Sequence, residues 1–226
     1  MLNIILAESE LELIPNEIIS NPLITSYSKQ HNKKPNNIIL DSNFHHRAMQ
    51  KLQEGNRRGR PDIAHIFLLS ALESIANKKR DLNIIIHTRN NEAIYVNPET
   101  RIMRSFHRYI GLMEQLFEKN KIISEEKTLL ELKKNKPLEK IIKELDYDYS
   151  IAFSQDAKIV KLPNYLKDLK KKNHKNILCI IGGFPSGDYH FNVSKHVDDT
   201  ISIYNEMLTA WTVTNELIVN YENIYL

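Results

Sequence analysis

Three arginines within four residues, followed by a proline and an aspartate, are the feature of this chain best suited to chemistry. They lie in the stretch Arg57-Arg58-Gly59-Arg60-Pro61-Asp62-Ile63. Because Pro61 suits a first helical position and an apolar run at helical spacing follows it, a helix is predicted to begin there. The arginines would then cluster at the positive end of that helix, where a polyanion binds. Asp62, in the first turn, is placed to orient or neutralise one of them.

A second set of arginines, Arg101, Arg104 and Arg108, is spaced by three and four residues, and no acidic residue lies between 100 and 110. If this segment is helical, the three side chains project from one face. Such a stripe without local partners suits a phosphate backbone. Pairing with acidic residues distant in the sequence is the alternative, and the spacing leaves it open.

Two polar segments follow predicted strands late in the chain. Gly182-Gly183-Phe184-Pro185-Ser186-Gly187-Asp188 comes after the fully apolar run 177–181, and residues 201–213 pass from a strand through a polar loop into the last helix. In open α/β sheets the ligand crevice lies beyond the carboxyl ends of the strands, and glycine lets a backbone approach a ligand closely. A tight turn and an ordinary capped helix are the alternatives. The glycine segment is not a phosphate P-loop, because it lacks the lysine and the Ser/Thr of that motif.

Apolar runs alternate with helical patterns along the chain, which predicts an α/β fold with a mostly parallel sheet covered on both sides. Strands are expected at 2–7, 38–40, 82–87, 93–96, 149–153, 158–162 and 177–181. Helices are expected at 44–53, 61–77, 105–119, 124–146 with a break at Pro137, 166–172 and 208–221. Residues 20–37, with two prolines and clusters of Ser and Asn, are expected to form a loop.

Composition narrows the classes of function. The chain has 226 residues, 42% hydrophobic and 26% charged, with a net charge of +3, which fits one large or two small globular domains whose electrostatics depend on local clusters. Cys179 is the only cysteine, and His45-His46 has no third ligand nearby, so no disulfide and no metal site are expected. His87, at a strand end, is expected to be a structural hydrogen-bonding group. No signal peptide or membrane-length apolar run is found, so a cytoplasmic protein without membrane contact is expected.

Together these stretches resemble the SPOUT-class RNA methyltransferases. Within that class they are similar to the ribosome-biogenesis family that methylates N1 of a pseudouridine in small-subunit ribosomal RNA. The resemblance runs from residue 3 to the last helix. It is carried by Leu40-Asp41-Ser42, the arginine motif at 57–63, Ile85-Ile86-His87-Thr88, Asn97-Pro98-Glu99-Thr100-Arg101 with Arg104 and Arg108, Ile181-Gly182-Gly183-Phe184-Pro185, Ser202-Ile203-Tyr204-Asn205 and Ala210-Trp211-Thr212-Val213.

The resemblance implies a single domain over 1–226 with a SPOUT-type sheet flanked by helices and a C-terminal trefoil knot formed by roughly residues 176–226. It also implies a homodimer. The methyl donor S-adenosylmethionine, which leaves as S-adenosylhomocysteine, would be held bent between the loops after Thr88, Gly182 and Ser202. The implied donor-binding residues are Thr88, Gly182, Gly183, Gly187, Ile201, Ser202, Ile203, Tyr204, Asn205 and Leu208.

By the same resemblance, RNA would be bound by Arg57, Arg58, Arg60, Arg101, Arg104 and Arg108. Arg60 and Asp62 would be the catalytic pair: Arg60 stabilises charge on the pyrimidine carbonyl, and Asp62 orients Arg60 or accepts the N1 proton. Small-subunit ribosomal RNA and ribosome-assembly proteins are the implied partners. Two other functions stay open, namely a non-catalytic assembly factor that binds the same kind of RNA and a SPOUT methyltransferase for another RNA such as transfer RNA.

Overall fold

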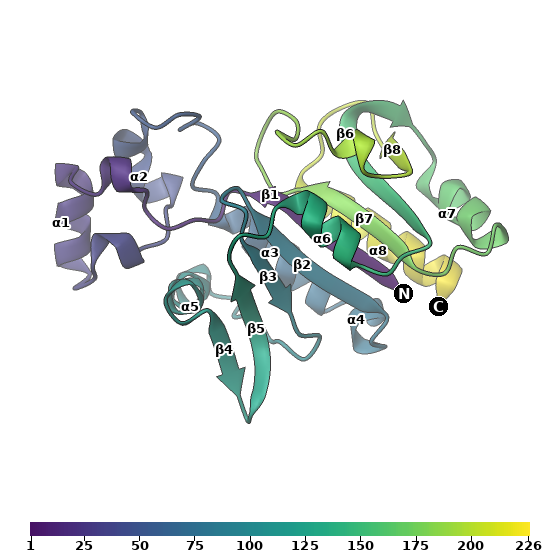
Figure 1. The fold of residues 1–226 in the computed structure, drawn as a ribbon, viewed down its shortest axis with the longest axis horizontal. Coiled ribbons are helices and arrows are strands. Elements are labelled where there is room, and N and C mark those ends of the chain that lie inside the picture. The colour runs from purple at the N-terminus through teal and green to yellow at the C-terminus, as the bar shows by residue number, and fades with distance from the viewer.

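The computed structural model describes residues 1–226 and contains one eight-stranded sheet (Figure 1). Its order is β4-β5-β3-β2-β1-β7-β6-β8, in which the five strands β2, β1, β7, β6 and β8 pair in parallel and the other three are antiparallel. The strands are β1 (Leu2–Ser9), β2 (Leu82–Thr88), β3 (Ala93–Val96), β4 (Lys121–Ser124), β5 (Lys127–Lys133), β6 (Tyr149–Ile159), β7 (Ile177–Gly182) and β8 (Asp199–Ser202). The predicted α/β class and the mostly parallel sheet are therefore confirmed.

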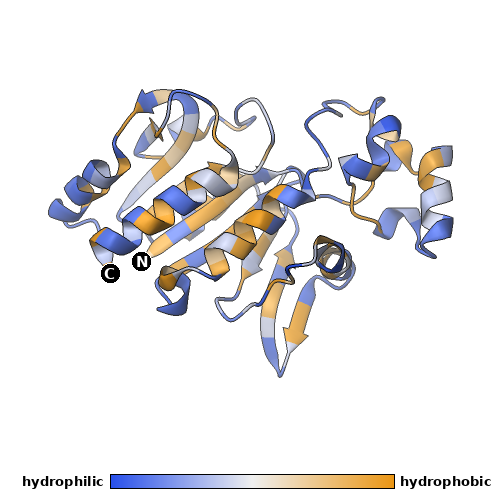
Figure 2. Ribbon diagram, turned by 180° about the vertical axis from the view of Figure 1, so that it is seen from behind, coloured by the Kyte–Doolittle hydropathy of each residue, from blue (hydrophilic) through white to orange (hydrophobic).

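Helices cover both faces of this sheet. Figure 1 shows α6 in front of it, and Figure 2, from behind, shows α3 and α8 lying across the opposite face. The helices are α1 (Pro22–Gln30), α2 (Ser42–Met49), α3 (Pro61–Leu72), α4 (Ile75–Lys78), α5 (Phe106–Lys119), α6 (Leu138–Glu144), α7 (Leu162–Lys171) and α8 (Ala210–Tyr225), with short 3-10 turns η1 (Asn16–Ile18), η2 (Pro35–Asn37) and η3 (Val193–Lys195). None of these helices combines the length and the apolar character needed to cross a membrane.

The central strand β1 is buried along its whole length, because alternate side chains enter two different cores. Leu2, Ile4 and Leu6 join the larger core under α3, α5, α7 and α8, whereas Ile5 and Ala7 join the smaller core under α6. Cys179, on the neighbouring strand β7, is a fully buried member of the larger core, as expected for a packing residue. Central strands buried on both faces read as continuous apolar runs, which is why their positions could be predicted.

Residues 10–60 leave the sheet and form a helical lobe, seen at the left of Figure 1 around α1 and α2. The lobe has a separate small core of Ile14, Ile18, Ile24, Ile38, Leu40, Ala48, Met49 and Leu52. The prediction of a loop at 20–37 was wrong here. Asn21 and Pro22 are the cap and first residue of α1, and the Asn21 side chain accepts the backbone N–H of Leu23 at 3.0 Å. The predicted strand at 38–40 is reduced to one bridge between Leu13 and Ile39.

Two other predicted elements differ in the structure. The first part of the helix expected at 124–146 is the hairpin β4–β5, and only α6, after Pro137, is helical. The hairpin turns at Glu125 and Glu126, whose φ values are +48° and +64°. Glycine and asparagine normally signal such a turn, so two glutamates concealed it. The two strands expected at 149–162 are the single strand β6, whose pairing with β8 shifts register between Phe153 and Lys158.

A buried histidine in the helical lobe predicts acid sensitivity. His45 accepts the backbone N–H of Asp41 at Nδ1, its Nε2 has no partner, and burial lowers the pKa of His45 to about 4. The unfolded chain binds this proton near pH 6.5 and the folded chain only near pH 4, so stability falls as pH drops through that window. We expect wild type to lose about 2 kcal/mol more than His45→Gln between pH 7.5 and pH 5. Urea unfolding at both pH values measures this, and equal losses in the two proteins would contradict it.

Candidate functional site

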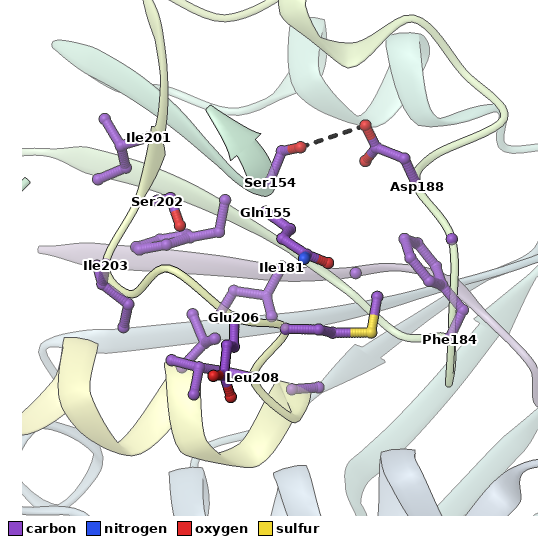
Figure 3. A pocket seen from close by; sticks show the side chains of 16 residues that line it. Ser154, Gln155, Ile181, Phe184, Asp188, Ile201, Ser202, Ile203, Glu206 and Leu208 are labelled. Carbon is purple, nitrogen blue, oxygen red and sulfur yellow. Dashed lines mark hydrogen bonds between the residues drawn. The ribbon is translucent and has the colours of Figure 1, made fainter. Parts of the chain in front are cut away.

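A pocket opens where β6, β7 and β8 approach one another at the carboxyl edge of the parallel strands (Figure 3). Its space is about 620 Å³ when the open mouth is included. The lining residues are Phe153, Ser154, Gln155, Ile181, Gly182, Phe184, Gly187, Asp188, Ile201, Ser202, Ile203, Glu206, Met207, Leu208, Ala210 and Val213. The predicted location beyond the strand ends is the one where this pocket lies.

The glycine segment after β7 forms one wall through close packing. A Cβ on Gly183 would lie 2.3 Å from Ser9 Oγ and 2.8 Å from Ser9 Cα, so only glycine fits against the end of β1. A Cβ on Gly182 would lie 2.6 Å from the ring of Phe184, which folds back over that residue. Tyr189 holds this wall to the next strand, because its hydroxyl contacts the carbonyl oxygens of Phe153 at 2.9 Å and Ile180 at 3.2 Å.

The chemistry of the pocket combines an apolar lining with carboxylates. Ile181, Ile201 and Leu208 supply apolar surface suited to a flat ring. Two carboxylates reach the pocket from different loops, Asp188 after β7 and Glu206 after β8, and Asp188 accepts the hydroxyl of Ser154 at 3.2 Å (Figure 3). No lysine or arginine lines the pocket. A ligand with an aromatic ring and a cationic end therefore fits it, whereas a polyphosphate does not.

The structure brings together six of the ten predicted donor-binding residues. Gly182, Gly187, Ile201, Ser202, Ile203 and Leu208 line the pocket, whereas Gly183 supports the wall from behind, and Tyr204 and Asn205 lie in the loop beside it. Thr88 is elsewhere: it is fully buried, and its hydroxyl donates to Glu92 at 3.0 Å. The third wall is formed by Phe153, Ser154 and Gln155 of β6, which the sequence analysis missed. The available signal was a polar pair directly after an apolar strand.

Arg60 and Asp62 form the pair that was predicted at the start of α3. The Nε and Nη2 atoms of Arg60 donate to the two carboxylate oxygens of Asp62 at 2.8 and 2.7 Å, with both side chains partly exposed. These bonds raise the pKa of the Arg60 guanidinium, so it stays charged. A bidentate pair of this kind fixes the plane of the guanidinium and leaves one edge free for a ligand.

Arg101, Arg104 and Arg108 are all exposed, and none forms a salt bridge. Their sharing one helix face required a helix over all three positions, and that condition is not met. Helix α5 begins only at Phe106, so Arg101 and Arg104 lie in the loop before it and Arg108 in its first turn. The loop is held near the Arg60–Asp62 pair because His65, one turn after Asp62, hydrogen-bonds the Met103 carbonyl oxygen at 2.8 Å.

Arg57 and Arg58, in contrast, do not face solvent, with exposures of 7% and 8%. Arg58 donates two hydrogen bonds of 2.7 Å to Glu12, and Arg57 bonds Glu8 and Glu10. The expected clustering of three arginines at the helix terminus is therefore corrected: only Arg60 presents its guanidinium there. The predicted RNA contact by Arg57 and Arg58 has no support in this geometry, because their charges are compensated inside the protein.

His87 is structural, as expected. Its Nδ1 accepts the backbone N–H of Glu8 at 3.2 Å and its Nε2 faces Asn91 Oδ1 at 3.2 Å, so the proton lies on Nε2. Burial lowers the pKa of His87, which keeps the ring neutral.

No group of three or more His, Cys, Asp or Glu side chains is arranged to hold a metal ion.

The fold is that of an α/β protein with a mostly parallel sheet, a pocket at the carboxyl edge of its parallel strands, and exposed arginines before and in the first turn of α5. Comparison with known proteins gives the family. Residues 4–222 match the model of the EMG1/NEP1 methyltransferase family, and the chain belongs to this family.

Similar proteins extend over nearly the whole chain. "Ribosomal RNA small subunit methyltransferase Nep1" of Pyrococcus furiosus is 48% identical over 221 residues, 98% of this chain and 96% of that protein. The protein of the same name from Methanothrix thermoacetophila is 44% identical over 223 residues, 99% of this chain and 96% of that protein. A crystal structure of Archaeoglobus fulgidus Nep1 bound to S-adenosylhomocysteine superposes with a TM-score of 0.85 at 33% identity, covering 98% of this chain and 97% of that one.

The close packing at Gly183 gives a prediction for the pocket wall. We expect Gly183→Ala to destabilise the protein by about 1–3 kcal/mol, because a backbone atom of Ser9 cannot move aside without separating β1 from the glycine loop. Gly111→Ala, on α5 with no atom within 4 Å of the new Cβ, is the matched control and should stabilise by up to about 1 kcal/mol. Urea unfolding of both variants provides the comparison. Wild-type stability in Gly183→Ala would show that the loop and β1 are not tightly packed.

Proposed function

We propose that this protein transfers the methyl group of S-adenosylmethionine to N1 of a pseudouridine in a small-subunit ribosomal RNA hairpin loop. The reaction would be a step of ribosome biogenesis in the cytoplasm, with ribosome-assembly proteins as further partners. The observation that carries the proposal is the pocket at the carboxyl edge of the parallel strands, in a chain that superposes over almost its full length on a Nep1 structure bound to S-adenosylhomocysteine.

The pocket residues fit the methyl donor. Apolar side chains of Ile181, Ile201 and Leu208 would contact the adenine ring, and the backbone of residues 201–208 would supply its hydrogen bonds. Asp188 and Glu206 would attract the cationic parts of the molecule, the sulfonium and the ammonium group. When bound, the donor supplies an activated methyl group, so the protein mainly has to align it with the attacking nitrogen.

The exposed arginines before and in the first turn of α5, together with Arg60, would hold the RNA. Arg101, Arg104 and Arg108 are exposed and form no salt bridge, and only Glu73 lies close enough to Arg101 and Arg104 for its pKa to be lowered by them, so the three guanidinium groups are available to phosphates. Arg60 would donate a hydrogen bond to a carbonyl oxygen of the unstacked pyrimidine, where negative charge develops as the N1 proton leaves. Because both carboxylate oxygens of Asp62 already accept bonds from Arg60, we propose that Asp62 orients Arg60 and does not take the proton.

We also propose a homodimer, and a trefoil knot in residues 176–226 as in the SPOUT class. An exposed apolar surface supports the dimer. A groove between the end of β6 and α8 is lined by Ile159, Ile203 and Tyr204 among others, and Val219, which precedes the lining residue Asn220 on α8, is 53% exposed. Exposed apolar surface of this kind marks a protein interface, and a second copy of this chain would cover it.

The reaction is tested by methyl transfer from labelled S-adenosylmethionine to two RNA hairpins that differ only in uridine or pseudouridine in the loop. We expect transfer to the pseudouridine hairpin alone. RNA binding without transfer would favour the non-catalytic assembly factor, and transfer without a need for pseudouridine would favour a methyltransferase for another RNA.

The roles of Arg60 and Asp62 are tested with the same assay. Arg60→Ala should lower the rate of methyl transfer by about 10²–10³-fold, and Asp62→Asn should lower it by less. Unchanged rates in both variants would exclude the assigned roles.

The RNA contacts are tested separately. Arg101→Ala, Arg104→Ala and Arg108→Ala should each weaken binding of the hairpin and lower the slope of log K against log salt by about 1, because each removes one phosphate contact. Lys172→Ala is the control, since the end of α7 lies at the opposite side of the molecule (Figure 1). Fluorescence titration at several salt concentrations measures the slopes. Loss of S-adenosylhomocysteine binding in these variants would show that the arginines belong to the pocket instead.

The dimer is tested by charge. Val219→Asp should shift the protein from dimer to monomer in analytical ultracentrifugation, because a carboxylate cannot be buried unpaired in an apolar interface. Ile75→Asp, on α4 and 56% exposed, is a matched change outside the groove and should leave the dimer intact. A wild-type monomer would refute the proposed dimer, and an unchanged dimer in Val219→Asp would refute this interface.

A further inference from the structure

The chain at the end of β1 connects the pocket wall to Arg60. Glu8 has φ +50°, in the left-handed region that costs energy for a residue with a side chain, and the pairing of β1 with β2 is irregular between Leu6 and Ser9. The Glu8 carboxylate accepts the backbone N–H groups of His190 and Phe191, both at 2.8 Å. The strained end of β1 therefore holds the segment that follows the pocket wall.

The backbone of Glu10 forms hydrogen bonds with both the pocket wall and Arg60. Its N–H donates to the Gly183 carbonyl oxygen at 3.2 Å, and its own carbonyl oxygen accepts the Arg60 N–H at 3.0 Å. The loop behind the pocket and the residue expected to contact the reacting base are thus attached to one residue. Any shift of the Glu10 backbone would move the pocket wall and Arg60 together.

The side chain of Arg57 completes this connection. Its Nε donates to Glu10 at 3.0 Å, Nη2 contacts Glu8 at 3.3 Å, and Nη1 donates to the Asp188 carbonyl oxygen at 2.8 Å. Its guanidinium also lies over the ring of Phe184, 3.9 Å from the centroid. Asp188 and Phe184 line the pocket, yet Arg57 itself does not. Arg57 is therefore bonded to two pocket residues while it lies three residues before Arg60.

Burial makes these bonds consequential. Glu8 and Glu10 are 5% and 1% exposed, and a buried charge is tolerated only with its partners in place. Arg89 pairs with the other oxygen of Glu10 at 2.8 Å, so the carboxylate is shared by two arginines. The neighbouring Arg58–Glu12 pair is as buried and as well bonded, but neither of its members contacts a pocket residue. The chain thus contains a matched pair of buried arginines, of which one supports the pocket.

We propose that Arg57 is a positioning residue that fixes the pocket wall at Phe184 and Asp188 relative to Arg60, so that methyl-donor binding and RNA binding are coupled through it. The proposal rests on the proposed function, since it assigns the two ligands to these two sites. Arg57 touches neither ligand. It acts by holding the main chain of Asp188 and the ring of Phe184, and through Glu10 the backbone of Arg60.

The experiment compares Arg57→Lys with Arg58→Lys in the full-length protein, with S-adenosylhomocysteine as the probe. Lysine keeps the buried charge, but its single ammonium cannot bond Glu8, Glu10 and Asp188 together while covering the Phe184 ring. We expect calorimetric titration to give about tenfold weaker binding in Arg57→Lys, the loss of one charged hydrogen bond, and wild-type affinity in Arg58→Lys. Similar affinity changes in both variants, or none in either, would overturn the proposal. If Arg57→Lys does not fold, Glu8→Gln and Glu12→Gln form the equivalent pair.

The coupling between S-adenosylhomocysteine binding and RNA binding provides a second test, because a residue that only stabilised the fold would leave this coupling unchanged. In wild type, a saturating pseudouridine hairpin should tighten S-adenosylhomocysteine binding by the same factor by which S-adenosylhomocysteine tightens RNA binding. We expect this factor to fall toward one in Arg57→Lys and to be retained in Arg58→Lys. A wild-type factor of one, or an unchanged factor in Arg57→Lys, would overturn the coupling. Absence of methyl transfer by wild type would instead refute the proposed function, because the titration without RNA does not depend on it.

Discussion

Charge compensation at the carboxyl end of β1 is the interaction on which the rest of the structure depends. The strand passes through an apolar core to the buried Glu8, and two more buried glutamates, Glu10 and Glu12, follow its last residue. Burial raises the pKa of Glu10, and only the guanidinium groups of Arg89 and Arg57 counter that effect. Three segments far apart in the sequence are thereby held at one point, which is where a parallel sheet also places its ligand sites.

The same compensation explains why the arginine motif was only half understood from its sequence. The run 57–60 reads as one basic patch, because a sequence shows the cations together and their acidic partners more than forty residues away. In the structure the alternating glutamates at the end of β1 and just after it pair with Arg57 and Arg58, and Arg60 remains for a ligand. The Arg60–Asp62 pair could be predicted because its two members are neighbours at a helix start.

Sequence patterns predicted an element correctly where burial alone determined its residues, and failed where contacts with distant parts of the chain determined its structure. Apolar runs predicted β1, β2 and β7 well, since a strand buried on both faces can contain little else. Asn21 and Pro22 fit a loop or a helix start equally, and a small core under α1 decided for the helix. The pocket wall at Phe153–Gln155 depends on a register shift between β6 and β8, which no local pattern encodes. Thr88 was assigned to the site by the family resemblance, but β2 lies two strands away from β7, and Thr88 does not line the pocket.

The position of β1 also bears on how the chain reaches its native state. Strand β1 lies in the middle of the sheet, and its residue Leu2 pairs in parallel with Leu82 on one side and Ile177 on the other. The N-terminal amine contacts the Lys175 carbonyl oxygen at 2.7 Å. Strand β7 must therefore leave the ribosome before β1 can pair with it. Pairings that span so much of the sequence close large loops and fold slowly, so β1 passes through a period with one exposed apolar edge during synthesis.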